Sequence, residues 1–218
     1  YALMTCAFFL WTRGKWATER RSPGSGNPLL RYAEVWKLDA ARAVALYALV
    51  ESFFFFGAFA FVGPMLKERF DLPLTLIGIA LAGFGLGGLL FNMSIRWFVR
   101  RNNPRGQVLG GGLLCGSMYV AVALLPVWQI AALCMLGVGF GFYMMHNILQ
   151  TRGTEAAPQS RGVGLALFGI TWTIGQGLGV MVMGAGVSVF DFAPMIAAYG
   201  VGFALLGFWM RANYFRLP

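Results

Sequence analysis

The sequence predicts an all-α membrane protein with six full transmembrane helices, preceded by the end of a truncated span. The first observation is composition: 58% of the 218 residues are hydrophobic and only 11% are charged, whereas soluble domains carry about 25% charged residues. The second is a series of six apolar runs of the length that a helix needs to cross a bilayer. The third is a one-sided distribution of arginine and lysine between those runs.

The first segment, 1–12, is apolar from Tyr1 onward, and basic residues follow it. A secretory signal peptide carries its positive charges before the apolar part, so this order argues against one. We therefore expect the end of a transmembrane span that begins before Tyr1, in a chain that is a fragment of a longer protein.

Residues 13–42 form the longest polar stretch and are predicted to be a central loop. The linker "RSPGSGNP" leads into "LLRYAEVWKL", which has one apolar and one charged helical face. The apolar face holds Leu29, Tyr32, Ala33 and Trp36, and the charged face holds Arg31, Glu34 and Lys37. This pattern favours a helix lying on the membrane surface, and an ordinary exposed connector is the alternative.

Six full spans follow the loop. Prolines support their limits, because Pro73, Pro126 and Pro194 fall at or beside the ends of apolar runs, where a missing N–H costs least. The predicted spans are 43–66, 74–98, 107–126, 128–150, 163–188 and 193–211.

The basic residues lie almost entirely on one side of these spans. Fifteen fall on the side of the central loop and two on the other, where Glu68 and Asp71 offset Lys67 and Arg69. Such a bias marks the cytoplasmic side. The central loop and the tail 212–218 are therefore predicted to be cytoplasmic. The fifteen are Arg13, Lys15, Arg20, Arg21, Arg31, Lys37, Arg42, Arg96, Arg100, Arg101, Arg105, Arg152, Arg161, Arg211 and Arg216.

Residue usage argues against several classes of site. Cys6, Cys115 and Cys134 lie in apolar runs without a CxxC spacing, so neither a disulfide framework nor a metal site is indicated. The net charge of +9 is explained by the membrane bias, and no nucleic-acid-binding motif accompanies it. We expect no nucleic-acid partner, no cofactor and no metal, and an enzyme is the weakest hypothesis.

Glycine is abundant within the spans, with 30 residues in the chain. Small residues spaced four apart let transmembrane helices approach closely. Four such pairs predict a tightly packed bundle: Gly83 and Gly87, Gly112 and Gly116, Gly137 and Gly141, and Gly175 and Gly179.

Glu51 stands about eight residues inside the first full span, roughly 12 Å deep at the helical rise. An ionised carboxylate at that depth is expensive, and intramembrane acids usually face a cavity and have a function. No Lys or Arg lies within a turn of it in the sequence. We take Glu51 as a proton-coupling candidate. The alternative is a buried, protonated carboxyl with a structural hydrogen bond.

The fourth full span carries the only histidine, His146. It belongs to a polar row with the i, i+3, i+4, i+7 spacing of one helical face. The row comprises Tyr143, His146, Asn147 and Gln150. A shared face predicts a water-filled cavity or a polar helix contact. A structural role at the helix end is the alternative for His146.

The fifth full span contributes Trp172 and Gln176, four residues apart on a face shared with Gly175 and Gly179. An aromatic ring beside an amide suits a substrate site, and ordinary packing of Trp against Gly explains the pair equally well. Both residues are kept as substrate-cavity candidates.

The order of segments resembles the C-terminal half of a major facilitator superfamily transporter. "FFFFGAFAFVGPMLKERFDLPLTLIGIALAGFGLGGLL" is similar to the seventh and eighth spans of its bacterial arabinose-efflux and drug:proton antiporter-like branch. "GFGFYMMHNILQTRGTEAAPQSRGVGLALF" is similar to the tenth span and the loop after it. One departure is "GGLLFNMSIRWFVRRNNPRG", which lacks the acid of the family's Gly…Asp-Arg…Gly-Arg-Arg motif.

The resemblance implies two inverted three-helix repeats, here 43–126 and 128–211, whose first spans line a central cavity. It places Glu51 and His146 on such spans. The implied activity is proton-coupled export of small organic molecules across the bacterial inner membrane, by rocking against the missing N-terminal half. A non-transporting assembly or scaffold protein of the same fold and a proton-independent uniporter are the alternatives.

Overall fold

A computed structural model describes residues 28–101 and 103–213 of the chain. These residues form helices, with no β-strand among them. A short helix, α2 (Pro28–Trp36), precedes the long helices α3 (Asp39–Phe70), α4 (Leu74–Arg101), α5 (Pro104–Leu124), α6 (Ala131–Glu155), α7 (Arg161–Phe190) and α8 (Phe192–Ala212). The 3₁₀ turns Trp128–Ile130 and Pro158–Ser160 lead into α6 and α7. The predicted truncated span 1–12, residues 13–27 of the predicted central loop and residues 214–218 of the predicted tail 212–218 lie outside the described residues.

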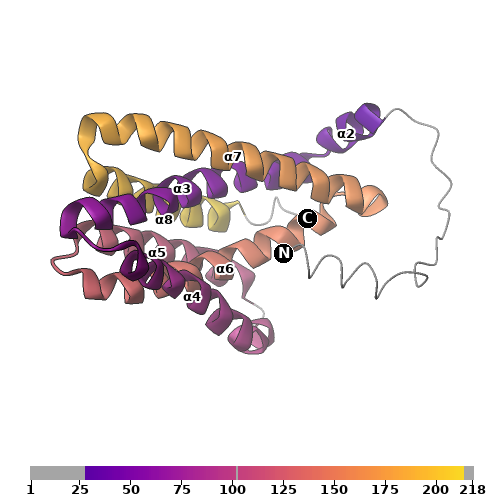
Figure 1. Cartoon of the computed structure of the whole chain (residues 1–218). Helices are drawn as coiled ribbons and strands as arrows, with labels where there is room; N and C mark the ends of the chain where they lie inside the picture. Colours follow the sequence, from indigo (N-terminus) through magenta and orange to yellow (C-terminus); the bar gives the residue numbers. More distant parts are fainter. Residues whose placement is uncertain (1–27, 102, 214–218) are drawn as a thin grey trace, which may run out of the picture.

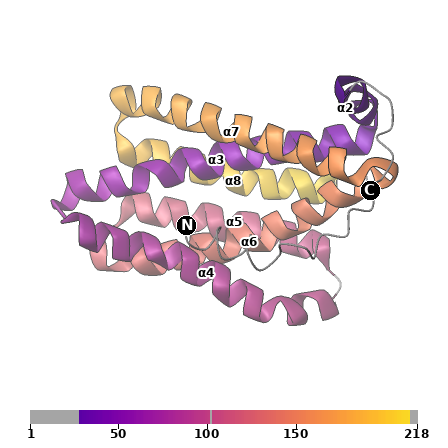
Figure 2. The same ribbon diagram turned by 45° about the vertical axis from the view of Figure 1, so that its right-hand side comes forward.

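The six long helices run side by side along the long axis of the molecule (Figures 1 and 2). Each is long and apolar enough to cross a membrane. The predicted all-α fold with six full spans is therefore confirmed. α2 stands at one end of the bundle beside α7 and α3 (Figure 2). It docks through Val35, which is buried, whereas Trp36 on the predicted apolar face is exposed.

The helices extend beyond the predicted apolar runs at several ends. The first predicted span, 43–66, is the middle of α3, which runs from Asp39 to Phe70. Charged residues continue the helix at both of its ends, because their side chains reach the water beside the bilayer. α5 also begins earlier than predicted, at Pro104, whose missing N–H costs nothing in a first turn.

Two aspartates end helices in the left-handed region of the backbone. Asp71 follows α3 with φ 48°, and Asp191 separates α7 from α8 with φ 75°. Aspartate tolerates this region better than most residues. The Asp191 carboxylate also accepts a hydrogen bond of 2.6 Å from the N–H of Phe192. Lys67 donates a 2.6 Å hydrogen bond to Asp71, and this bond lowers the pKa of that exposed carboxyl.

Close helix contacts occur where glycine pairs were predicted, with one exception. A Cβ at Gly175 or Gly179 of α7 would overlap the α3 backbone, and one at Gly83 or Gly87 of α4 would overlap the α6 backbone. Gly112 and Gly116 of α5 likewise meet the backbone of α8. The prediction is wrong for Gly137, because the side chain of Met118 fills the space beside it, although Gly141 does contact the α5 backbone.

The main helix contacts come in matched pairs. α3 packs on α7 and α8, and correspondingly α6 packs on α4 and α5. α3 contacts α6, and α5 contacts α8. Exchanging α3, α4 and α5 for α6, α7 and α8 leaves this pattern unchanged. Two three-helix repeats would produce such a pattern, and the division at 126–128 stays a prediction.

Candidate functional site

A buried acid and the histidine of the polar row meet between α3 and α6. The Oε2 atom of Glu51 lies 2.7 Å from Nδ1 of His146. The Glu51 side chain is 0% exposed and that of His146 is 14% exposed. The two residues are 95 positions apart in the sequence, so packing of α3 against α6 creates the contact.

Aromatic rings surround the imidazole of His146. The ring of Phe142 stacks on it with centroids 4.9 Å apart. Trp172 and Phe168 of α7 lie 5.6 Å and 5.9 Å from it. Phe56, five residues beyond Glu51 on α3, meets Trp172 edge to face at 5.0 Å. The pair therefore sits among apolar rings, where an electrostatic interaction is stronger than in water.

Two polar atoms near the pair lack a hydrogen-bond partner among the described residues. They are Oε1 of Glu51, an acceptor when ionised, and Nε1 of Trp172, a donor. Buried polar atoms normally have partners, and exceptions often mark functional positions.

The chemistry available here is proton exchange. The pair can exist as carboxylate and imidazolium or as carboxylic acid and imidazole, and both forms are neutral overall. A further proton converts it to a carboxylic acid beside an imidazolium, which carries one positive charge and cannot form the same ion pair. Among the described residues, no cluster of three or more His, Cys, Asp or Glu could hold a metal ion.

The structure brings Glu51, His146 and Trp172 together and places the remaining candidates elsewhere. The ring of Tyr143 packs against α4 over Gly88 and lies 5.7 Å from the ring of Phe84. Asn147 lines a cavity of about 340 Å³ with residues of α4 and α5. Gln150 is exposed.

On α7, Gln176 is half-buried one turn from Trp172. The roles of all six substrate-cavity candidates stay predictions.

Sequence reasoning missed the contact between Glu51 and His146. It searched for a basic partner within one turn of Glu51, whereas the partner comes from another helix. It did contain a hint, because the family resemblance places both residues on the first spans of their repeats. The aromatic rings of Phe142 and Phe168 could not be distinguished from ordinary core residues.

Comparisons with known proteins agree with this architecture. The sequence model of the Major Facilitator Superfamily matches residues 2–180. An uncharacterized MFS-type transporter of Bacillus subtilis (strain 168), YceJ, is 25% identical over 166 residues. The match covers 74% of this chain and 41% of that relative, so the chain spans about two fifths of its length. No solved structure matches.

Six membrane-capable helices among residues 28–101 and 103–213 fit a family of multi-pass membrane transporters, whose members are not enzymes. Because the family model covers most of the sequence, the chain belongs to the Major Facilitator Superfamily.

Proposed function

We propose that the chain is the C-terminal half of a proton-coupled exporter of small organic molecules, of the arabinose-efflux and drug:proton antiporter-like branch. The observation that carries this proposal is the buried pair of Glu51 and His146, held between α3 and α6. A carboxyl buried inside a membrane span is costly in a purely structural protein, and intramembrane acids usually lie on ion pathways. Transport would proceed by alternating access, as this half rocks against the N-terminal half.

The coupling step follows from the charge of the pair. In the outward-facing state, a proton from outside binds Glu51 while the imidazole of His146 is protonated. The added proton breaks the ion pair and removes the carboxylate as an acceptor, which favours release of a substrate hydrogen-bonded to it. In the inward-facing state, the proton leaves to the cytoplasm and the neutral pair forms again. One proton moves inward for each such cycle, and the substrate moves outward.

The unpartnered atoms beside the pair support a place for substrate there. Oε1 of Glu51 and Nε1 of Trp172 offer hydrogen bonds, and the rings around His146 offer apolar contact. A small organic molecule with a polar group and an apolar body suits this mixture. Tyr143, Asn147, Gln150 and Gln176 remain substrate-cavity candidates in the intact protein.

The distribution of charge supports an inner-membrane orientation with the basic end in the cytoplasm. α3, α5 and α7 begin at the same end of the bundle at which α4, α6 and α8 finish (Figure 1). At that end Arg100, Arg101 and Arg211 lie in last helical turns, whereas Lys67 and Arg69 are the basic residues at the opposite end of the described part. Positive residues favour the cytoplasmic side.

Glu51→Gln tests the proposal, because glutamine keeps the size and hydrogen bonding of the side chain but cannot release a proton. Inside-out vesicles containing the intact transporter are given an acidic interior and a panel of organic compounds. Mass spectrometry then measures which compounds accumulate in proportion to the transporter. We expect wild-type accumulation that disappears when the pH gradient is collapsed, and no gradient-driven accumulation by Glu51→Gln.

Glu68→Gln is the matched control, since it removes an exposed acid from the same helix. It should retain gradient-driven accumulation. Transport by Glu51→Gln with unchanged pH dependence would move the coupling role to another residue. Accumulation that ignores the gradient in the wild type would indicate a uniporter. A wild-type protein that moves none of the panel would favour the scaffold alternative.

A further inference from the structure

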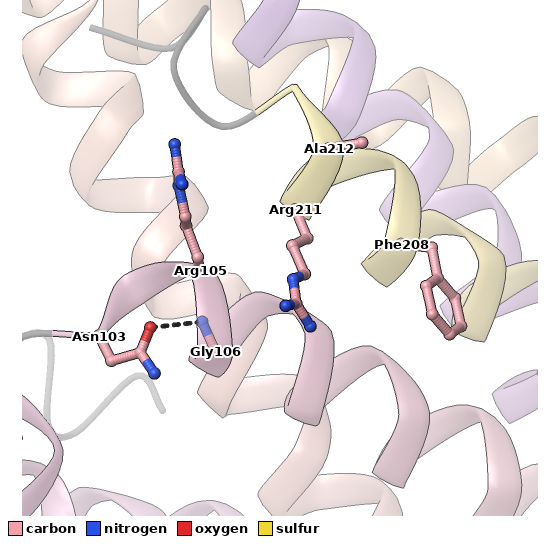
Figure 3. A pocket seen from close by; sticks show the side chains of 6 residues that line it. All are labelled: Asn103, Arg105, Gly106, Phe208, Arg211 and Ala212. Atoms are coloured by element: carbon pink, nitrogen blue, oxygen red, sulfur yellow. Dashed lines mark hydrogen bonds between the residues drawn. The ribbon is translucent and has the colours of Figure 1, made fainter.

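The two members of the buried pair differ in their access to solvent. The Glu51 side chain is 0% exposed, so neither of its oxygens meets water, whereas the His146 side chain is 14% exposed. An open cavity of about 530 Å³ lies at the basic end of the bundle between the first turn of α5 and the last turn of α8 (Figure 3), and neither residue lines it. In this conformation the pair therefore contacts solvent through the His146 side chain itself.

Of the two ring nitrogens of His146, Nε2 is the open one. Nδ1 lies 2.7 Å from Oε2 of Glu51 and is engaged in that hydrogen bond. Nε2 has no hydrogen-bond partner among the described residues, yet it is not one of the buried polar atoms that lack a partner, as Oε1 of Glu51 is. A nitrogen that is neither bonded nor buried is open to solvent. The imidazole thus has one nitrogen on the acid and the other facing outward.

The described side chains around the pair do not carry protons to water. Phe142 stacks on the imidazole, and the neighbours from α7 are the rings of Phe168 and Trp172, none of which titrates. From α5, the thiol of Cys115 interacts electrostatically with Glu51, but it is fully buried. Protons that leave the pair in this conformation must therefore pass through the imidazole.

We propose that Nε2 of His146 is the atom from which the pair releases protons to water on the cytoplasmic side. This inference deepens the proposed coupling step and rests on it for the direction of release. Within α6, His146 lies nearer to Glu155, at the basic end, than to Ala131 at the start of the helix. Glu51 sets the charge of the pair, and His146 gives the pair its contact with water.

The release step is a single proton transfer. In the doubly protonated pair, the acid proton of Glu51 lies on Oε1, and Oε2 accepts the Nδ1–H of the imidazolium. The ring has lost its carboxylate partner, and apolar surroundings disfavour an unpaired cation. The Nε2–H bond breaks, its electron pair stays on the nitrogen, and the proton joins water as hydronium. A carboxylic acid beside a neutral imidazole remains, and nothing is oxidised or reduced.

Proton-detected solid-state NMR of the intact transporter in lipid bilayers tests the exit directly. The protein carries [15N]histidine, and signals that are absent from His146→Asn are assigned to His146. Exchange with water is measured for both ring protons in one sample, so Nδ1–H is the internal control for Nε2–H. We expect exchange at Nε2 to be about tenfold faster or more, since Nδ1–H is held against a buried acid. Equal rates, or faster exchange at Nδ1, would overturn the proposal.

His146→Asn also tests whether transport uses this exit. The asparagine amide can donate a hydrogen bond from near the position of Nδ1, but it has no second nitrogen at the position of Nε2. We expect this variant to lose gradient-driven accumulation in inside-out vesicles, and retained accumulation would overturn the exit. Thr154→Ala is the matched control, because it removes from the same helix a hydroxyl that bonds to the carbonyl of Thr151. It should retain accumulation.

The two measurements separate this inference from the proposed function. Slow exchange at Nε2 in a wild-type protein that accumulates substrate would overturn the exit and leave the exporter standing. Fast exchange at Nε2 in a wild-type protein that accumulates none of the compounds would support the open nitrogen and overturn the exporter.

Discussion

At the scale of single residues, Glu51 and His146 each make the burial of the other tolerable. A charge buried without a partner is expensive, and a paired one costs much less. The Glu51 side chain is fully buried and has the 2.7 Å contact to His146 as its one hydrogen bond among the described residues. Their contributions to stability should therefore depend strongly on each other.

A double-mutant cycle measures that dependence. His146→Ala alone leaves the carboxyl of Glu51 without its partner, whereas His146→Ala with Glu51→Gln removes the charge as well. We expect a coupling free energy of about 1–3 kcal/mol between the two sites. Unfolding of the purified protein in mixed detergent micelles gives the four free energies. Additivity within about 0.5 kcal/mol would show that the contact contributes little.

Sequence alone identified both residues of this pair but not their contact. A glutamate deep in an apolar run and a lone histidine in a polar row are visible because they break a pattern. Their proximity depends on how α3 crosses α6, and no local pattern encodes that crossing. The polar row was visible for the same reason, yet Tyr143 and His146 contact different helices. Spacing defines the face of a helix but not the neighbour that each side chain meets.

At the scale of helices, glycine determines how closely neighbours approach. Gly175 and Gly179 of α7 face the backbone carbonyls of Leu49 and Phe53 on α3. These contacts hold α7 against the helix that carries Glu51, and they bring Trp172 toward His146. The i, i+4 spacing predicted the contacts correctly here, since both glycines fall on one face. It failed at Gly137, where a long side chain occupies the adjacent space.

Gly179→Ala should destabilise the protein much more than Gly177→Ala on the same helix. A Cβ at Gly179 would overlap the carbonyl group of Phe53, whereas a Cβ at Gly177 has nothing within 4 Å. We expect the first change to destabilise the protein by about 1–3 kcal/mol, as overpacking does. The second should be neutral or stabilising by up to about 1 kcal/mol, because alanine is the better helix former. Thermal unfolding of the two purified variants compares them directly.

Equal unfolding temperatures for these two variants would mean that α3 and α7 can move apart without a loss of stability. That result would contradict the close contact of α3 and α7.

At the scale of the whole molecule, the two ends of the bundle differ in charge. The end with Lys67 and Arg69 is held by a hydrogen bond of 2.9 Å from Arg69 to the carbonyl of Ala123, which joins α3 to α5. The sequence predicted the number and order of the spans because hydrophobic length is a strong pattern. The predicted span was shorter than α3, because the charged residues that continue this helix into the headgroup region do not count as apolar.

Cysteine labelling tests the orientation of the two ends. In a variant without the native cysteines, a membrane-impermeant thiol reagent applied to intact cells should label Lys67→Cys and leave Arg161→Cys unlabelled. Both positions are exposed, so access to the reagent depends on the side of the membrane. Arg161→Cys should become reactive once the cells are opened. Labelling of Arg161→Cys in intact cells would reverse the proposed orientation.

The distance in sequence between Glu51 and His146 also has a consequence for biosynthesis. The ribosome completes α3 well before it makes His146, which lies 95 residues after Glu51. At about 5–20 residues per second, the delay is on the order of 5–20 seconds. During that time Glu51 enters the bilayer without its partner. The run of phenylalanines from Phe53 to Phe56 makes α3 hydrophobic enough to insert alone, so the newly made protein can wait for α6 before the pair forms.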